Sequence, residues 1–143
     1  MNVPEGDRYE IDTAPDRIDA ALVHHWLSTD AYWALGRERE VVDRAIRGSL
    51  NFGAYDPAGA QVAYARVVTD LATFAWLCDV YVDPAHRGTG LGSRLATAVR
   101  DHLAPYKLTR IMLATLDAHG LYAKLGFVPV PNPEMWMVLA AEG

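Results

Sequence analysis

One stretch of this chain, residues 74–103, constrains its fold more than any other. Residues 74–82 are almost wholly apolar, which predicts a strand buried on both faces. Asp83 and Pro84 end that run, and a glycine-rich segment follows. After the glycines, apolar side chains recur at four-residue steps, as in a helix: Leu91, Leu95, Val99 and Leu103. The chain must therefore place a glycine loop between a buried strand and a helix.

The N-terminal half contains two helical patterns and a hairpin pattern. Helical spacing predicts a first helix that opens at Pro15 and ends near Ser28, and a second that ends before Leu50. Two runs rich in aromatic and branched residues, at 51–55 and 61–68, flank an Asp-Pro-Ala-Gly turn. They predict a β-hairpin ahead of the buried strand.

The C-terminal part adds a strand, a short helix and two further strand patterns. Residues 108–114 predict a strand, and Asp117 is expected to cap a short helix that runs through Leu125. The glycine directly after that helix supplies its left-handed end. Residues 127–130 and 135–139 predict two closing strands, with prolines between them or at their edges.

This order of elements predicts the fold class. Helix, helix, three strands, helix, strand, helix and two strands would give an α+β protein with a mixed but mostly antiparallel central sheet. Helices would cover both faces of that sheet. A doubly wound parallel sheet would instead need helices between all its strands. Residues 1–143 are expected to form a single domain, because the chain has the usual length of one.

Charge and composition exclude several classes of protein. A formal net charge of −5 gives no overall basic surface for nucleic acid. A single cysteine, Cys78, allows no internal disulfide, and no cluster of carboxylates or cysteines completes a metal site around His24 and His25. The N-terminus lacks the pattern of a secretory signal, and no apolar run is long enough to span a membrane. We therefore expect a cytoplasmic protein with no metal and no membrane or nucleic-acid partner.

The segment Arg87-Gly88-Thr89-Gly90-Leu91-Gly92 is the main chemical signal. Between a strand and a helix, it places free backbone amides and the positive end of the helix dipole at one point, where an anion binds. Glycine lets phosphate oxygens approach the main chain, and Arg87 adds a planar cationic group. A Walker loop would need a Gly-Lys-Ser/Thr sequence, which is absent. A dinucleotide-binding loop normally follows the first strand of a parallel sheet, whereas this loop follows the third strand of a hairpin series. The alternative is a tight turn without a ligand.

Two segments resemble the signatures of the GNAT superfamily of N-acetyltransferases. Residues 81–92 resemble its acyl-CoA signature, Arg/Gln-x-x-Gly-x-Gly/Ala after a strand. Residues 121–127, Leu-Tyr-Ala-Lys-Leu-Gly-Phe, resemble its Leu-Tyr-x-Lys-x-Gly-Phe segment on the helix after the next strand. Both occur in the family's order, and the order of elements agrees over nearly the whole chain.

The resemblance implies that acetyl-CoA is the cosubstrate and indicates where it binds. Backbone groups at Val80, Tyr81 and Val82 would pair with the pantetheine arm. The pyrophosphate would lie against the amides of the glycine segment: Arg87, Gly88, Thr89, Gly90, Leu91 and Gly92. In the family, the strands predicted here at 74–82 and 108–114 splay apart near their ends, and the cofactor lies in the gap.

Tyr122 and Asp79 are the candidate catalytic residues. The resemblance implies that Tyr122 contacts the cofactor near its sulfur and protonates the leaving thiolate; the alternative is a packing role. Asp79 is a lone carboxylate in an apolar strand, and a buried acid needs a partner or a task. It is expected to orient or deprotonate the amine, or else to be held by a hydrogen-bond donor.

The acceptor pocket is expected near the loop after the first helix. The resemblance implies that this part of the fold forms the pocket, here with Ser28, Asp30, Tyr32, Trp33 and Arg37. The two aromatic residues would either select the substrate or form a lid packed on the sheet. His119 lies three residues before Tyr122 on the short helix, which makes it a candidate substrate contact or a surface histidine.

These observations predict an N-acetyltransferase that moves an acetyl group from acetyl-CoA directly to a primary amine of a small molecule. Two alternatives stay open: a lysine or peptide acetyltransferase, and an acyl-CoA-binding sensor that has lost the chemistry. The sequence does not identify the acceptor, because many substrates share this fold and cofactor. The strand pattern at 135–139 could pair between subunits, so a homodimer is a further expectation.

Overall fold

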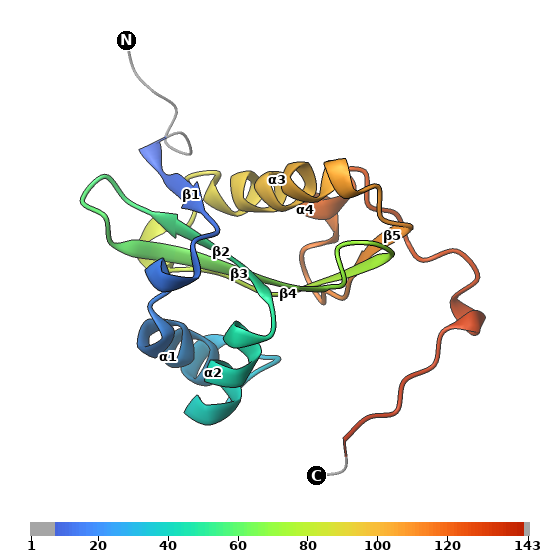
Figure 1. Cartoon of the computed structure of the whole chain (residues 1–143), viewed down its shortest axis with the longest axis horizontal. Helices are drawn as coiled ribbons and strands as arrows, with labels where there is room; N and C mark the ends of the chain where they lie inside the picture. Colours follow the sequence, from blue (N-terminus) through green and yellow to red (C-terminus); the bar gives the residue numbers. More distant parts are fainter. Residues whose placement is uncertain (1–7, 142–143) are drawn as a thin grey trace.

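A five-stranded sheet forms the centre of the protein, whose computed structural model describes residues 8–141 (Figure 1). The strands lie across the sheet in chain order: β1 Glu10–Asp12, β2 Leu50–Tyr55, β3 Gln61–Thr69, β4 Phe74–Val82 and β5 Arg110–Leu113. Neighbours from β1 to β4 are antiparallel, whereas β4 and β5 are parallel. The predicted α+β fold with a mixed, mostly antiparallel sheet is confirmed.

Helices cover both faces of the sheet. α1 Ala20–Asp30 and α2 Arg39–Arg47 lie on one face, and α3 Leu91–Leu103 and the short α4 His119–Ala123 lie on the other (Figure 1). In residues 8–141 no helix combines the length and the hydropathy needed to cross a membrane.

Each face of the sheet has its own cluster of buried side chains. α3 buries the predicted four-residue repeat against the sheet: Leu91, Leu95, Val99 and Leu103. On the opposite face, α1 and α2 bury Val23, Trp26 and Val42 against Tyr64 and Tyr81. Full burial of each large apolar side chain contributes about 1.5–3 kcal/mol, so these two clusters fix the helices on the sheet.

The N-terminal boundaries differ from the prediction. The first helix begins at Ala20 rather than Pro15, because Asp19 caps it by accepting a hydrogen bond from the Leu22 amide (3.1 Å). It ends at Asp30, two residues beyond Ser28. Strand β1 was not predicted at all: its three residues pair with β2, but they are too few to show a periodic pattern.

The C-terminal prediction is partly wrong. The closing strands expected at 127–130 and 135–139 do not form, and residues 131–141 are exposed. Prolines in this segment lack the N–H that a strand ladder needs. Asp117 does not cap α4; the Thr115 hydroxyl accepts from the Ala118 amide instead (3.0 Å). Gly126 does end the helix region with a left-handed φ of 99°.

Burial in β4 also differs from the prediction. Instead of lying in a strand buried on both faces, its side chains alternate between buried and half-buried positions. Ala75 and Leu77 are buried under α3, whereas Trp76 and Cys78 are half-buried on the other face. One face of β4 is therefore open to solvent where α1 and α2 do not reach it.

Candidate active site

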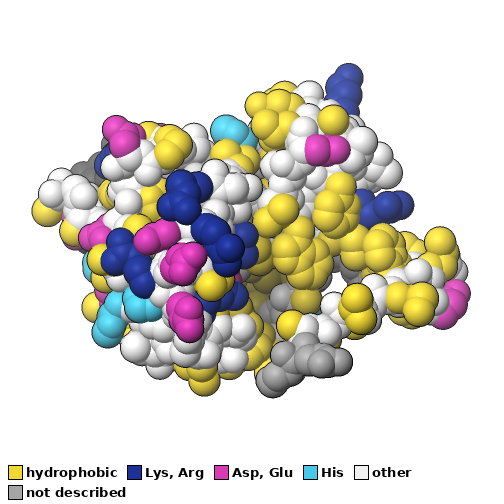
Figure 2. Space-filling view, turned by 60° about the horizontal axis from the view of Figure 1, so that its bottom comes forward, with side chains coloured by type: hydrophobic (Ala, Val, Ile, Leu, Met, Phe, Trp, Pro, Cys, Tyr) yellow, Lys and Arg dark blue, Asp and Glu magenta, His cyan; other side chains and the backbone are white. Residues whose placement is uncertain are grey.

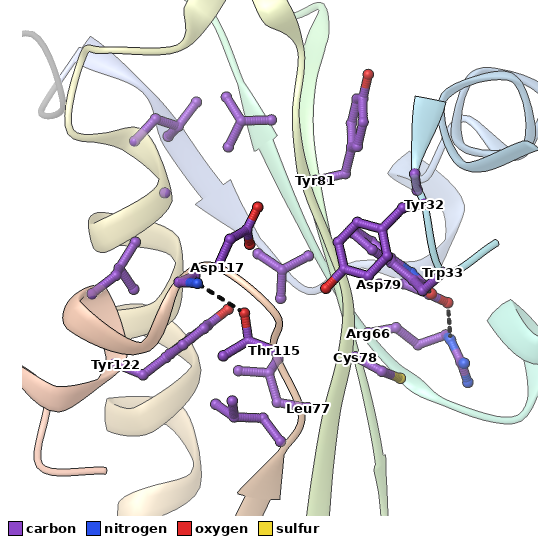
Figure 3. Close-up of a pocket in the computed structure, with 18 of the residues that line it drawn as sticks. Tyr32, Trp33, Arg66, Leu77, Cys78, Asp79, Tyr81, Thr115, Asp117 and Tyr122 are labelled. Carbon is purple, nitrogen blue, oxygen red and sulfur yellow. Dashed lines mark hydrogen bonds and ion pairs between the residues drawn. The ribbon is translucent and has the colours of Figure 1, made fainter. Parts of the chain in front are cut away.

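A pocket opens where β4 and β5 separate. The strands pair from Phe74 with Arg110 to Leu77 with Leu113, after which β4 continues without β5 to Val82. The splayed arrangement expected from the resemblance is therefore present. A pocket of 820 Å³ lies at the gap, between β4, the start of α3, α4 and the loop from α1 to α2 (Figure 3).

A bulge in β4 lies at the centre of this pocket. The register between β3 and β4 shifts by one residue opposite Ala65, which faces both Asp79 and Val80. A bulge leaves one residue out of the strand ladder, so its backbone groups are available to another partner. Asp79 has a φ of 51°, in the left-handed region that few non-glycine residues adopt.

The glycine loop leaves the first turn of α3 unblocked. Gly88 and Gly90 have φ values of 79° and 83°, and a Cβ added to either would meet nothing within 4 Å. Gly90 is the N-cap of α3, and no side chain caps the helix. Within the described residues, the amides of residues 88–93 have no hydrogen-bond partner. Free amides at a helix N-terminus form an anion site.

Arg87 is held beside this loop by three contacts. Its Nε donates to the Val82 carbonyl (2.9 Å), and its Nη2 donates to Asp30 (3.2 Å). Tyr81 also donates its hydroxyl to Asp30 (2.6 Å) and packs under the Arg87 guanidinium. Burial and the Asp30 carboxylate raise the pKa of Tyr81 to about 12. Arg87 thus lies at the pocket wall, at the end of α1.

Asp79 is buried, with 4% of its surface exposed, and has three side-chain partners. Trp33 donates to its Oδ1 (2.8 Å), while Arg37 (2.9 Å) and Arg66 (2.8 Å) both donate to its Oδ2. Burial alone would raise the pKa of this carboxyl, but Arg66 and Arg37 outweigh it and lower the pKa below its ordinary value. Asp79 is therefore a stabilised carboxylate and a weak base.

Tyr122 reaches the pocket from the other side of β4. Figure 3 shows its side chain running from α4 with the hydroxyl toward β4. The ring packs edge-on against Phe127, with ring centroids 5.7 Å apart. Burial, with smaller contributions from Asp117 and Tyr32, raises the pKa of Tyr122 above its ordinary value of 10. No hydrogen-bond partner for this hydroxyl occurs among residues 8–141.

The two aromatic residues of the α1–α2 loop contact opposite walls of the pocket. Trp33 binds Asp79 of β4, whereas the Tyr32 hydroxyl accepts a hydrogen bond from the Leu116 amide, in the loop between β5 and α4 (3.1 Å). Their rings meet edge to face at 4.9 Å. The loop thus bridges the gap, with Tyr32 crossing in front of β4 (Figure 3).

The surface around the loop is partly apolar. Tyr32 and Trp33 keep 50% and 41% of their surface exposed. Figure 2 shows hydrophobic side chains gathered in the middle of this face of the molecule and along the C-terminal segment, beside a mixed group of basic and acidic side chains. The pocket lining, which includes Trp33 and Trp76 as well as Asp30 and Arg37, offers both apolar and charged contacts.

Most of the residues predicted for the site line one pocket, and three do not. Ser28, Thr89 and His119 lie outside its lining. The Ser28 carbonyl accepts from the Gly36 amide (2.9 Å), and the Thr89 hydroxyl donates to the His86 carbonyl (2.8 Å), so both shape neighbouring loops. His119 is exposed at the start of α4.

Asp30 and Arg37, both expected near the acceptor pocket, line it, whereas sequence reasoning missed several other residues of the pocket: Arg66, Trp76, Thr115 and Asp117. Arg66 carried a usable signal, since it is the one charged residue in an otherwise apolar or uncharged strand pattern at 61–68. Cys78 also lines the pocket, but burial raises the pKa of its thiol to about 11, so it is not a ready nucleophile.

A split sheet with an unblocked anion site at the gap defines a class of enzyme, the acyltransferases that take their acyl group from a CoA thioester. The sequence matches the Acetyltransferase (GNAT) family over residues 20–127, and the chain belongs to that family. Enzymes of the family use acetyl-CoA as the acetyl donor.

Individual proteins agree with this assignment. A crystal structure of a GNAT-family protein from Xanthomonas campestris, provisionally described as an acetyltransferase, is similar with a TM-score of 0.88, 44% identity and 93% coverage of both chains. A protein of Gibberella zeae with the same provisional description is 30% identical, over 87% of this chain and 80% of that one. Thialysine N-epsilon-acetyltransferase of Caenorhabditis elegans is 24% identical, over 73% and 68%.

Proposed function

We propose that the protein transfers an acetyl group from acetyl-CoA directly to a primary amine of a small molecule, with Tyr122 as the general acid. The position of the Tyr122 hydroxyl carries this proposal. It points toward the gap beside β4 and has no hydrogen-bond partner within the described chain (Figure 3). The residue is buried, yet its hydroxyl keeps some contact with the pocket, so it is available to donate a proton to a group bound in the gap.

The pocket has the features that acetyl-CoA needs. Free amides behind Gly88 and Gly90 suit a pyrophosphate. Beyond Leu77 the side of β4 that faced β5 has no neighbouring strand, which suits the amides of a pantetheine arm along Val80, Tyr81 and Val82. When bound, acetyl-CoA supplies an activated acetyl group and a thiolate leaving group.

The protein's own groups match the steps of acetyl transfer. Because its pKa lies above 10, Tyr122 stays protonated at neutral pH and can give its proton to the sulfur as the C–S bond breaks. A backbone N–H at the β4 bulge is a candidate donor to the oxyanion that forms when the amine attacks the thioester. The attacking amine must be neutral, and the extra proton that it carries after attack passes to solvent water.

Asp79 orients the acceptor side of the pocket and does not act as the base. Its lowered pKa makes the carboxylate a weak proton acceptor, since three donors already bind it. These bonds fix Trp33 and Arg37 of the α1–α2 loop against β4. Asp79 therefore positions the acceptor side of the pocket rather than deprotonating the amine.

A small-molecule acceptor is favoured over a protein segment. The hydrogen bond between Tyr32 and Leu116 crosses the front of the pocket. The pocket is therefore more enclosed than an open peptide-binding groove. The C. elegans relative is named for acetylation of thialysine, a small molecule.

The test is release of free CoA thiol from acetyl-CoA in the presence of amino acids, polyamines, aminoglycosides, arylamines and lysine peptides. We expect release with one class of small amine. Tyr122→Phe should lower kcat by about a hundredfold or more, with little change in the KM for acetyl-CoA, because general acid catalysis contributes about 10²–10⁴-fold.

Tyr106→Phe is the matched control, since Tyr106 is exposed after α3 and does not line the pocket. It should leave kcat unchanged. An unaltered kcat in Tyr122→Phe would remove the general-acid assignment. Turnover only with lysine peptides would favour a peptide acetyltransferase, and stabilisation by acetyl-CoA without any turnover would favour a sensor.

A further inference from the structure

The ion cluster around Asp79, on the acceptor side of the pocket, carries more positive than negative charge. Arg37 and Arg66 share the single carboxylate of Asp79, and both donate to the same oxygen, Oδ2. Within residues 8–141 neither guanidinium forms an ion pair with any other acid. Two permanent positive charges against one negative charge leave a surplus of one.

Of the two arginines, Arg37 has more N–H donors without a side-chain partner in the described chain. Only its Nη1 has a side-chain partner in the described chain, although a guanidinium carries five N–H donors. Arg66 is more fully used, because its Nη1 also donates to the Ser49 hydroxyl (3.0 Å). The Arg37 side chain is 22% exposed and lines the pocket. Its free donors therefore stay accessible to a ligand.

The backbone fixes Arg37 in this place. Its amide donates to the Ala34 carbonyl (3.0 Å), and its own carbonyl bonds to Nε2 of His24 (3.1 Å). The preceding residue, Gly36, has a φ of 76° and donates to Ser28 (2.9 Å). An arginine whose backbone and Nη1 are both already held loses little conformational freedom when its guanidinium binds an anion, and this favours affinity.

The walls next to Arg37 are aromatic. Trp33 and Trp76 line the same pocket from the α1–α2 loop and from β4, and Tyr32 closes its front. Such walls suit an apolar stretch between two polar ends of a ligand. The reacting amine would lie at the β4 bulge, so a second polar end would reach Arg37.

We propose that the acceptor is a primary amine that also carries a carboxylate, as amino acids do, and that Arg37 binds this carboxylate. A surplus of one positive charge matches a carboxylate better than a phosphate monoester, whose charge at neutral pH is near −2. This inference rests on the proposed function, because it names the acceptor class of the same site.

The experiment compares pairs of acceptors that differ only in the carboxylate: lysine with cadaverine, and phenylalanine with phenethylamine. The wild type should show a higher kcat/KM for the carboxylated member of the productive pair. Arg37→Gln should raise the KM for that acceptor by about ten- to a hundredfold, as for a lost charge-assisted hydrogen bond, and should raise the KM for the decarboxylated amine and for acetyl-CoA by much less.

Arg39→Gln is the matched control, since Arg39 is half-exposed, pairs with Asp43 and lies outside the pocket. A binding readout avoids dependence on turnover: the N-acetylated amino acid should raise the Tm of the wild type and of Arg39→Gln, but not of Arg37→Gln.

Two results separate the two levels of the proposal. Acetyl transfer with equal use of both members of each pair, or an equal effect of Arg37→Gln on both, would overturn the carboxylate inference and leave the transferase standing. Preference for phosphoethanolamine over every carboxylated amine would also overturn it. Absence of CoA release with every acceptor would overturn the proposed function itself.

Discussion

Asp79 connects three parts of the chain that are far apart in sequence. Its partners Arg37 and Trp33 come from the α1–α2 loop, and Arg66 comes from β3. The sequence singled out Asp79 as an isolated acid but gave no sign of which cations pair with it. Arg37 lies 42 residues away and Arg66 lies 13 residues away, so only the folded sheet brings them together.

We expect Asp79→Asn to lower the free energy of unfolding by about 3 kcal/mol. The loss lies at the low end of the range for a broken buried ion pair, because both guanidinium groups keep some contact with water. Urea denaturation measures it. Asp43→Asn is the control: this acid pairs with Arg39 one turn away on the surface of α2, and its loss should change stability by about 0.5 kcal/mol or less.

The same pair of variants gives a test by pH. The pKa of Asp79 is lowered on folding, so its stabilising effect is present above the ordinary value of 3.8 and is lost as the pH falls from there through the folded pKa. The difference in stability between wild type and Asp79→Asn should therefore shrink in acid below about pH 4. A difference that stays constant down to pH 2 would contradict an ionised Asp79.

At the scale of elements, the glycine loop and α3 act as one unit. α3 is fixed by its buried leucine face, and its first turn has no side-chain cap. Gly90 adopts a left-handed φ of 83° in open space. The loop therefore leaves the helix amides exposed to the pocket, and any side chain at Gly90 would lie next to them.

Gly90→Ala should reduce stability by about 1–2 kcal/mol through backbone strain and raise the KM for acetyl-CoA by about tenfold or more. Gly59→Ala separates the two effects. Gly59 has a φ of 89° in the β2–β3 turn, also with nothing within 4 Å, but it lies outside the pocket. It should show a similar loss of Tm with an unchanged KM. Equal KM values in both variants would contradict an anion site at Gly90.

Elements defined by their own periodicity were predicted well, and elements that depend on a distant partner were not. The repeat in α3 and the runs in β2, β3 and β4 gave the right structures because each pattern is complete within one segment. β1 is recognisable only from its pairing with β2. The apolar residues at 135–139 have strand-like composition, but they pair with no strand in the described sheet.

On the scale of the whole molecule, neither the segment at 131–141 nor the outer edge of β5 pairs with another strand of the described chain. β5 pairs only with β4 in the described sheet, and the segment at 131–141 extends away from the body (Figure 1). Met137 and Leu139 are 96% and 100% exposed. An exposed apolar segment and an open sheet edge both favour association, and both features occur in every copy of the chain.

We therefore expect the protein to dimerise, with this segment of each copy packed on the other. Light scattering after size exclusion should give twice the chain mass at micromolar concentration, and Met137→Asp should shift the protein toward the monomer. Val41→Asp places the same charge at an exposed apolar position of α2 and should leave the dimer intact. A monomeric wild type would contradict the expectation.

Strand β4 divides the pocket between two sets of elements. The glycine loop, α3 and α4 form the side proposed here for acetyl-CoA, while the α1–α2 loop, Arg66 and Trp76 form the side proposed for the acceptor (Figure 3). Substitutions in one set need not disturb the other. A lineage of such proteins can therefore acquire a new substrate by drift in one surface loop, while the machinery for the shared donor is inherited unchanged.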